Sequence, residues 1–505
     1  MSNGYVNDKP FFVARIRGGQ VEIKGEPHCN LGHRIDGGDG VFAEWHWDGE
    51  TITATNDRYG FYPLYYYHDG DSFVVSPSLI RMMPFCRQRE FDGPALGVYF
   101  RTGSLIGEDT PFLNIKVLGP GATLKWRFGT MSASGGSRPA SEPVSISRDE
   151  AIERFNHLFV RAIEKRRPRT QDVYVALSGG RDSRHILLEL LRQGIRPDAC
   201  VTFKDFPDWR GQDLPVAQAL VKAAGLRHVV LEQGSNRFES ERRKNLVTDL
   251  CASRSVKMLT LADFFNSRAQ TVYDGVAGML AQSFFIESQQ NIHYKNGELD
   301  LLTNQFLQKW ASGDKVLGLV LSRRTCELLC YERAFTHLKE EVVRHCAAAN
   351  PVASYYFWNR TRRDIALIPY AMFSGVPYVY SPYIDHDLAS FLMSLPAKII
   401  EDGTFHDDTI RRAYPEYAHI PFEDKSAPKP AGAKAHWASF VGDFSRHYFG
   451  AKGFRSRMLN NGYLAPRMLR SLVDGKYRET SQWLPLLRIL NILQLEELAD
   501  CRREY

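Results

Sequence analysis

The sequence predicts an α/β protein, in which a small antiparallel β-domain precedes a doubly wound parallel sheet with a helical C-terminal extension. Residues 10–127 contain short alternating apolar runs separated by Gly, Asp and Pro turns, as in a packed antiparallel sheet. From residue 149 onward, amphipathic helical stretches alternate with short apolar runs, which is typical of a parallel sheet. We therefore expect a β-domain over residues 1–130, a Ser/Pro/Gly-rich linker over 131–148 and a second domain over 149–505.

The individual elements follow from local patterns. In the β-domain, the clearest strands are residues 40–47, 51–55 and 73–76. In the second domain, apolar residues at helical spacing predict a helix over 149–166, and Gly194 is the expected stop of another helix that starts at Ser183. Beyond about residue 300 the pattern is mostly helical. The remaining elements expected are strands over 173–177, 199–203 and 228–231 and a helix over 214–224.

Composition excludes some classes of protein. The chain has 505 residues, enough for two or three domains, and a formal charge of only +6, which permits an acidic ligand without requiring one. Its eight cysteines show no spacing typical of a disulfide framework or a zinc site. No apolar stretch is long enough for a signal core or a membrane span, so we expect a cytoplasmic protein. The Tyr-rich segments 65–67 and 378–383 fit half-buried sheet better than a nucleic-acid platform, and no nucleic-acid partner is expected.

The strongest chemical signal is a glycine-rich turn between a strand and a helix. The apolar run ending at Leu177 leads into Ser178-Gly179-Gly180-Arg181-Asp182-Ser183. Glycines let the backbone approach phosphates closely, and the unpaired amides at a helix start favour an anion. Ser178 and Ser183 add hydroxyl donors, and the Asp182 carboxylate can hold Mg²⁺. The segment lacks the Gly-x-x-x-x-Gly-Lys pattern of phosphoryl-transfer enzymes. It predicts a nucleotide-phosphate site with bound ATP and Mg²⁺, against the alternative of an ordinary tight turn.

Three basic or titratable groups next to this loop have two interpretations. Arg181 and Arg184 can bind pyrophosphate or an acidic substrate, or they can lie on a solvated helix edge. His185 can reach a phosphate or pack against the next element.

These residues resemble the asparagine synthetase family, including β-lactam synthetases and lasso-peptide cyclases. Ser178–Ser183 looks like the pyrophosphate loop of that family, in its PP-loop ATP pyrophosphatase domain. Residues 201–228 look like the following βαβ unit, whose strand end, here Phe203, contacts adenine. Segments 381–385, 395–398 and 420–425 resemble C-terminal landmarks of the family. The resemblance implies that Lys425 meets phosphate and the developing oxyanion.

The N-terminal part resembles a class II glutamine amidotransferase domain that has degenerated. Residues 57–66 are similar to its Asp-Arg-Phe-Gly hairpin, and residues 119–121 to its closing Pro-Gly turn. Glutaminases of this family use an N-terminal cysteine as nucleophile, whereas Ser2 follows Met1 here and the first cysteine is Cys29. We therefore expect no glutamine hydrolysis.

Two further positions depart from the family pattern. The Gly-x-Gly-Gly-Asp-Glu segment aligns with residues 275–280, beginning at Gly275, so Met279 replaces an aspartate that binds Mg²⁺. A thioether is too soft for that ion, and Asp274 is the candidate substitute ligand. Tyr378 replaces the catalytic glutamate, and can position a group or relay a proton.

The resemblance implies a cytoplasmic ATP-dependent ligase that activates a carboxylate as an acyl-adenylate and then forms an amide bond. Loss of the glutaminase nucleophile favours a small-molecule or peptide substrate from natural product biosynthesis, including peptide macrocyclisation, with a partner protein of the same pathway as an option. Two alternatives stay open. The chain is a catalytically degenerate ATP-binding scaffold, as Met279 and Tyr378 suggest, or it performs another PP-loop adenylation.

Overall fold

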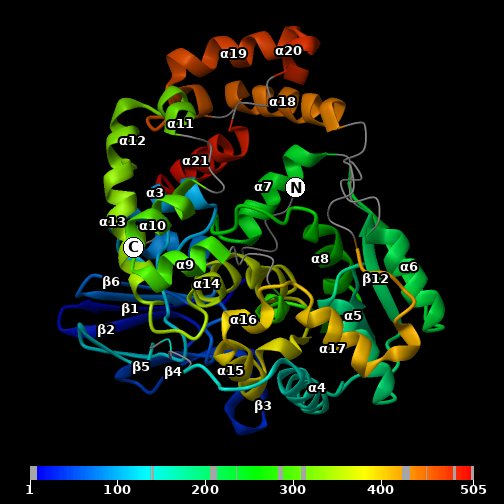
Figure 1. Cartoon of the computed structure of the whole chain (residues 1–505). Helices are drawn as coiled ribbons and strands as arrows, with labels where there is room; N and C mark the ends of the chain where they lie inside the picture. Colours follow the sequence, from blue (N-terminus) through cyan, green and yellow to red (C-terminus); the bar gives the residue numbers. More distant parts are fainter. Residues whose placement is uncertain are drawn as a thin grey trace.

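The computed structural model describes residues 8–136, 138, 142–204, 213–234, 236–282, 288–308, 314–423, 433–450, 452–480 and 485–501. Within them the chain is a mixed α/β structure with three five-stranded sheets. The two antiparallel sheets are formed before residue 135, and the third sheet is parallel and formed after residue 172. In Figure 1 the antiparallel sheets lie together at the lower left, in blue and cyan, and the parallel sheet lies at the right near β12 and α6.

The antiparallel strands confirm the β-rich character of the N-terminal part. Strands predicted at 40–47, 51–55 and 73–76 appear with ends shifted by at most one residue. One sheet has the order β2 (Gln20–Gly25), β1 (Phe12–Arg17), β7 (Ser72–Ser76), β6 (Tyr65–His68) and β8 (Ile115–Val117). The other has the order β10 (Thr130–Ser134), β9 (Thr123–Arg127), β5 (Thr51–Asn56), β4 (Asp39–Trp47) and β3 (His28–Ile35).

The N-terminal part also contains a helix that the periodicity analysis missed. Helix α3 (Gly93–Thr102) begins after Asp92, whose side chain accepts a hydrogen bond from the Ala95 amide, and ends at Gly103 with a φ of 84°. An acidic N-cap and a left-handed glycine are the usual limits of a short helix. Strand β10 extends into the predicted linker, while residues 142–147 form neither helix nor strand.

The parallel sheet follows the predicted alternation closely. Its order is β13 (His228–Glu232), β12 (Ala199–Lys204), β11 (Val173–Ala176), β14 (Thr271–Tyr273) and β15 (Tyr378–Tyr380), with every pair parallel. The helices between and beside these strands are α4 (Arg148–Glu164), α5 (Asp182–Arg192), α6 (Asp213–Ala223) and α8 (Met258–Asn266). Helix α4 starts with a capping box between Ser147 and Glu150. Gly194, with a φ of 74°, follows the end of α5 as expected.

Beyond residue 300 the described chain is mostly helical, as predicted, and its one strand is β15. Helices α18 (Ala433–Gly450), α19 (Asn461–Val473) and α20 (Gly475–Thr480) form an upper layer in Figure 1, with α21 (Leu486–Ala499) below it. The other helices of more than five residues are α7 (Arg237–Val247), α9 (Ser288–Asn296), α10 (Leu299–Gln308), α11 (Asp314–Val320), α12 (Arg323–Leu328), α13 (Tyr331–Val343), the π-helix η4 (Tyr356–Ile365), α15 (His386–Ser394) and α17 (Phe405–Ala413).

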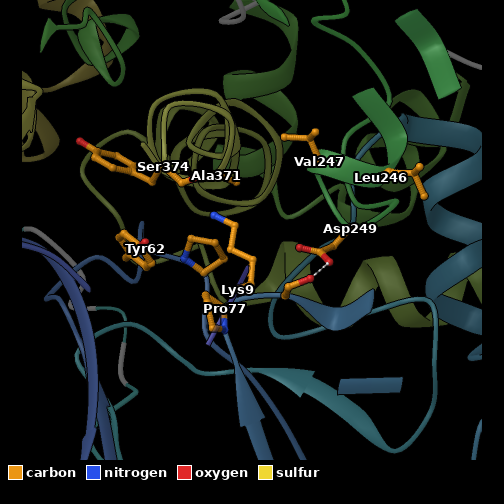
Figure 2. Close-up of a pocket in the computed structure, with 11 residues that line it drawn as sticks. Lys9, Tyr62, Pro77, Leu246, Val247, Asp249, Ala371 and Ser374 are labelled. Atoms are coloured by element: carbon orange, nitrogen blue, oxygen red, sulfur yellow. Dashed lines mark hydrogen bonds between the residues drawn. The ribbon is translucent and has the colours of Figure 1, made fainter. Parts of the chain in front are cut away.

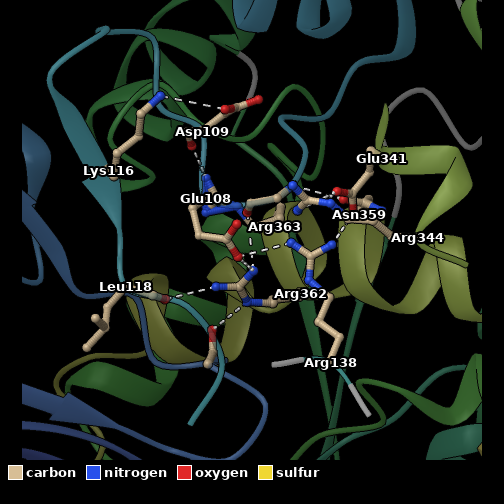
Figure 3. Close-up of polar contacts among 12 residues, drawn as sticks. Glu108, Asp109, Lys116, Leu118, Arg138, Glu341, Arg344, Asn359, Arg362 and Arg363 are labelled. Carbon is tan, nitrogen blue, oxygen red and sulfur yellow. Dashed lines mark hydrogen bonds and ion pairs between the residues drawn. The ribbon is translucent and has the colours of Figure 1, made fainter. Parts of the chain in front are cut away.

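The apolar core continues from the antiparallel sheets into the parallel sheet. One cluster of buried side chains contains residues of both, from Phe12 to Ile420. The π-helix η4 joins the same two parts through polar contacts (Figure 3). Arg362 donates to the carbonyls of Leu118 (2.9 Å) and Gly107 (3.2 Å), and its burial lowers its pKa to about 9. Buried donors and acceptors need such partners, so η4 is held firmly against the N-terminal part.

Candidate functional site

The order in which strands are added to the parallel sheet reverses at β11, and such a reversal is a common position for a ligand. From β11 the chain adds β12 and then β13 on one side, and it later returns to place β14 on the other side. In open parallel sheets, ligands bind at the carboxyl ends of the strands where the order reverses. The segments that leave the carboxyl ends of β11 and β14 are residues 177–183 and 274–282, so both predicted phosphate and metal segments meet at this point.

The loop after β11 is anchored to the sheet and closed by its own serines. Leu177 is buried, and its amide donates to the Val201 carbonyl at 2.9 Å. The Ser178 amide donates to Ser183 Oγ at 3.0 Å, and the Gly180 amide donates to Ser178 Oγ at 3.2 Å. The two hydroxyl oxygens are 3.2 Å apart. The turn therefore has the predicted strand–loop–helix geometry, with the serine hydroxyls inside it.

The two glycines of the loop have different surroundings. A methyl group at Gly179 would meet the Asp213 carbonyl oxygen at 2.8 Å and Val216 Cβ at 3.1 Å. At Gly180 the same addition would meet only Ser178 Oγ, at 3.2 Å, within a 4 Å radius. Neither residue has a positive φ, so space and not backbone conformation distinguishes them. Gly179 is required for packing against α6, whereas Gly180 faces the open side of the loop.

The amides of the loop are not all directed at open space, contrary to the simplest expectation for an anion cradle. The Gly179 amide donates to Asp213 Oδ1 at 2.7 Å. A carboxylate oxygen is the same kind of acceptor as a phosphate oxygen, so Asp213 holds one donor that an anion would otherwise use.

The segment of residues 274–282 packs on the side chain of Asp182. An added methyl at Gly278 would overlap Asp182 Oδ1, and one at Gly275 would lie 2.8 Å from Asp182 Cβ. Glycine is therefore required at both positions to let this segment approach the carboxylate. Asp182 Oδ1 accepts a hydrogen bond from Gln282 Nε2, a contact that the sequence did not suggest. The Asp182 side chain keeps 31% of its surface exposed, which a metal ligand needs.

Asp274 and Met279 lie on this second segment in different environments. The Asp274 amide donates to the Tyr380 carbonyl, and its Oδ1 accepts from the Val276 amide at 2.8 Å. Burial raises the pKa of Asp274 to about 6. Met279 Sδ accepts a hydrogen bond from Thr361 Oγ1 of η4 at 2.8 Å. Ala277 between them has a φ of 70°, a conformation that costs a residue with a side chain on the order of 1 kcal/mol.

The two arginines of the loop have structural partners. Arg184 is buried and donates to the carbonyls of Ile420 (2.9 Å) and Pro421 (2.6 Å). Arg181 forms a two-pronged pair with Asp407 of α17. Their predicted alternative as a solvated helix edge is wrong for Arg184, which instead fixes the chain that follows α17. Neither guanidinium is directed at a ligand by these contacts.

The remaining predicted residues are distributed as follows. Phe203 is near the carboxyl end of β12, and Lys257 Nζ lies 4.9 Å from its ring centre. Tyr378 is at the amino end of β15, paired with Thr271 at the start of β14, so the structure does not bring it to the loop. This placement does not support the predicted catalytic role of Tyr378, which stays a prediction. Lys425 lies outside the described residues.

Two of the hollows among the described residues lie next to each other and away from the loop. One, of about 300 Å³, lies beside β3 and β15 and is lined by His33, Tyr62 and Tyr370 among others. The other, next to it, offers only about 10 Å³, room for one water (Figure 2). It contains Lys9, whose pKa burial lowers to about 8, and Asp249, whose pKa burial raises to about 6. Neither hollow is lined by the loop residues.

Other features limit the chemistry of the site. In the ranges that the structure covers, no group of three or more His, Cys, Asp or Glu side chains is arranged to hold a metal ion. A Mg²⁺ ion needs no such group when phosphates and water complete its shell, so Asp182 alone or with Asp274 remains compatible with Mg²⁺ bound together with ATP.

All eight cysteines are free thiols. Among the helices described, none is long and apolar enough to cross a bilayer.

No family model and no curated protein matches this chain.

Proposed function

We propose that the chain is an ATP-dependent, AMP-forming amide ligase of the asparagine synthetase type that works without glutamine hydrolysis. The observation that supports this most is the meeting of the Ser178–Ser183 loop and the 274–282 segment at the point where the strand order reverses. Two glycines of one segment packed on the aspartate of the other, together with the open space beside Gly180, suit the close approach of a triphosphate.

The proposal assigns one role to each residue of the candidate site. Gly180 and the Ser178 and Ser183 hydroxyls contact pyrophosphate oxygens, Phe203 lies beside adenine, and Asp182 holds Mg²⁺. The ion supplies charge neutralisation at the phosphates. Lys425, in the role that the resemblance implies, neutralises charge at the α-phosphate and then at the oxyanion.

The reaction has two steps. A substrate carboxylate oxygen attacks the α-phosphorus of ATP, and pyrophosphate leaves. An amine nitrogen then attacks the acyl carbon, AMP leaves with the bonding electrons, and the nitrogen loses a proton. A peptide or amino-acid-derived substrate that carries its own amine is the substrate class we favour, because no glutaminase supplies ammonia.

The N-terminal part supports the absence of glutaminase activity in one respect. Cys29, the first cysteine of the chain, lies on β3, and burial raises the pKa of its thiol to about 12. A nucleophilic cysteine needs a lowered pKa. Cys29 therefore lacks the thiolate that glutamine hydrolysis requires.

A second candidate function is ATP binding without turnover. Two contacts favour it: Met279 is held by Thr361 at the position of an expected ligand, and Asp182 accepts from Gln282. The first contact keeps a poor metal ligand in place, and the second occupies an Asp182 oxygen, so both weaken the binding of Mg²⁺. Another PP-loop adenylation remains a third option.

The decisive experiment measures AMP formation from α-labelled ATP. Panels of amino acids and peptides supply carboxylates, and hydroxylamine serves as a general amine that traps an acyl-adenylate as a hydroxamate. We expect carboxylate-dependent AMP from the wild type and a loss of at least about 100-fold in Lys425→Ala, the scale of removing an oxyanion donor. The matched control is Lys339→Ala, a partly exposed lysine on α13 paired with Asp300. ATP binding without AMP from any substrate supports the second candidate, and AMP formation insensitive to Lys425 contradicts that residue's role.

A further inference from the structure

The larger of the two hollows lies beside the edge strands of two different sheets. Strand β3 is the outermost strand of one antiparallel sheet, and β15 is the outermost strand of the parallel sheet. The ring of His33 on β3 meets the ring of Tyr380 on β15 edge-on, with 4.9 Å between the ring centres. The hollow of about 300 Å³ is bounded by β3 and by the chain from η5 (Ile368–Met372) to β15. Its volume is that of the smaller binding sites for organic molecules in proteins.

Most of the wall of this hollow is apolar. Tyr62 and Tyr370 contribute aromatic rings. A side chain at Gly32, which has a φ of 74°, would overlap the Val41 carbonyl oxygen and meet the Tyr62 ring at 3.0 Å, so glycine lets Tyr62 lie directly against β3. The other apolar residues of the wall are Leu31, Pro369, Phe373, Val376, Pro377 and Val379. Such a wall suits a flat, largely apolar ring.

Two buried polar side chains in the wall lack hydrogen-bond partners. His33 and Tyr62 are only 8% and 7% exposed, and both line the hollow. Neither the ring nitrogens of His33 nor the hydroxyl of Tyr62 forms a hydrogen bond with any residue that the structure describes. The hydroxyl of Tyr370, by contrast, donates to Ser381 Oγ at 2.8 Å. Because buried polar groups almost always have a partner, His33 and Tyr62 indicate either water or a ligand in the hollow.

The hollow offers no charged group to a ligand. Burial, together with the positive charges of Arg166 and Arg169, lowers the pKa of His33 to about 3, so near neutral pH its ring has one N–H donor and one lone pair. With His33 neutral, none of the lining residues carries a formal charge. Lys9 lines the smaller hollow next to this one (Figure 2) and not the larger one. An ionised ligand would lose its hydration here without gaining an opposite charge.

We propose that this hollow binds a small uncharged aromatic molecule whose polar group both donates and accepts a hydrogen bond, as the hydroxyl of a phenol does. The hydroxyl of the ligand donates to the lone pair of His33 and accepts from the hydroxyl of Tyr62, while its ring packs on the apolar wall. The site is separate from the 178–183 loop, and the proposal does not rest on the function proposed above.

The first test is a titration of the full chain with phenol, followed in methyl spectra of protein labelled with ¹³C at its leucine and valine methyl groups. The methyl groups of Leu31, Val376 and Val379 line the hollow, and conservative substitution of each assigns its signals. We expect saturable shifts of these signals with a dissociation constant on the order of 1 mM. Shifts that do not saturate, or no shifts, mean that the hollow holds water only and overturn the proposal.

Two further probes test the chemical class of the ligand. Benzoate has a ring of the same size but is ionised, and toluene is uncharged but has no hydrogen-bonding group. We expect benzoate to bind at least about tenfold more weakly than phenol, and toluene about three- to tenfold more weakly. Benzoate that binds less than about tenfold more weakly contradicts the uncharged class. Toluene that binds as tightly as phenol contradicts the polar recognition.

Two variants test the polar side chains. Tyr62→Phe removes a single oxygen atom, and its matched control is Tyr66→Phe, a half-buried tyrosine of β6 that does not line the hollow. We expect Tyr62→Phe to weaken phenol binding about three- to tenfold and Tyr66→Phe to leave it unchanged. Equal affinity in these two variants contradicts the part assigned to the Tyr62 hydroxyl.

The histidine is tested in the same way. His33→Phe keeps a ring against Tyr380 but removes both ring nitrogens, and His28→Phe, at an exposed position of the same strand, is its control. We expect a similar loss of phenol binding in His33→Phe alone, and an unchanged affinity there contradicts the part assigned to His33. If His33→Phe unfolds, Tyr62→Phe still decides the proposal. No ATP is present in these titrations, so a failure of the proposed function leaves their outcome unaffected.

Discussion

In the parallel sheet, the amino edge, formed by the amino ends of the strands, and the carboxyl edge, formed by their carboxyl ends, use polar groups in opposite ways. At the amino edge, Asp198 accepts from the Val173 amide at 2.7 Å, and the hydroxyls of Thr170 and Thr271 are 2.9 Å apart. These bonds join the ends of adjacent strands to their connections. At the carboxyl edge, an added methyl group at Gly180 would meet only Ser178 Oγ within 4 Å, and the glycines of the 274–282 segment admit Asp182. The contrast fits an amino edge that maintains the fold, and it supports the proposal that a ligand binds at the carboxyl edge.

The largest effect that distinguishes the edges is expected from their aspartates. Asp182→Ala should weaken Mg·ATP binding by at least about 100-fold, because a ligand to the ion is lost. Asp198→Ala should leave that affinity unchanged but lower the free energy of unfolding by about 1–3 kcal/mol, because the Val173 amide loses its partner. Calorimetric titration and urea unfolding of both variants measure the two quantities. Equal ATP affinity in the two variants would remove the distinction between the edges.

The adjacent glycines provide a finer comparison within the carboxyl edge. Gly180→Ala should preserve stability and weaken Mg·ATP binding about tenfold, because a methyl group occupies the open side where phosphate approaches. Gly179→Ala should instead destabilise the fold by about 1–3 kcal/mol, since its methyl group meets Asp213 and Val216. The same two measurements apply. Loss of stability in Gly180→Ala with normal binding would mean that the open side is not a ligand surface.

Tyr378 tests whether a residue at the amino edge takes part in ATP binding or in the reaction. Tyr378→Phe removes a hydroxyl from a strand start that the structure places away from the loop. We expect Mg·ATP affinity and AMP formation within about twofold of the wild type, as for a surface change without a catalytic contact. A loss of 100-fold in AMP formation would restore the catalytic role that the sequence suggested.

The smallest expected effect concerns Ala277. Glycine adopts a φ of 70° without a side-chain penalty, so Ala277→Gly should change the free energy of unfolding by no more than about 1 kcal/mol, toward greater stability. Thermal unfolding measures it. A clear loss of stability would show that the methyl group packs usefully and that the strain argument for this segment is wrong.

Three strands of the parallel sheet were predictable because each carries its own apolar pattern, whereas β14, with only three residues, was not predicted. The strands at 173–176, 199–204 and 228–232 are apolar runs, and Gly194 and the capping box at Ser147 are local stop and start signals. Helix α3 carried such signals too, at Asp92 and Gly103, but its apolar residues suited a strand as well.

The site was only partly predictable because its contacts join distant segments. The loop at 178–183 is one continuous motif, whereas His406 and Gln282 reach Asp182 from about 220 and 100 positions along the chain. No local pattern marks them. Tyr378 shows the converse: an alignment to a motif suggested a role for it, which stays a prediction, while strand register places it at the amino end of β15. Arg184 looked available to a ligand until its two backbone carbonyl partners were known.

The most direct test of the central claim is to locate bound nucleotide by photolabelling with 8-azido-ATP in the presence of Mg²⁺, followed by peptide mapping. We predict that unlabelled ATP competes with the label and that modified peptides contain residues 177–183 or 199–204, at the carboxyl edge. Labelling confined to other peptides, such as those near Lys9 or Tyr378, or labelling that ATP does not reduce, would contradict a nucleotide site at this edge.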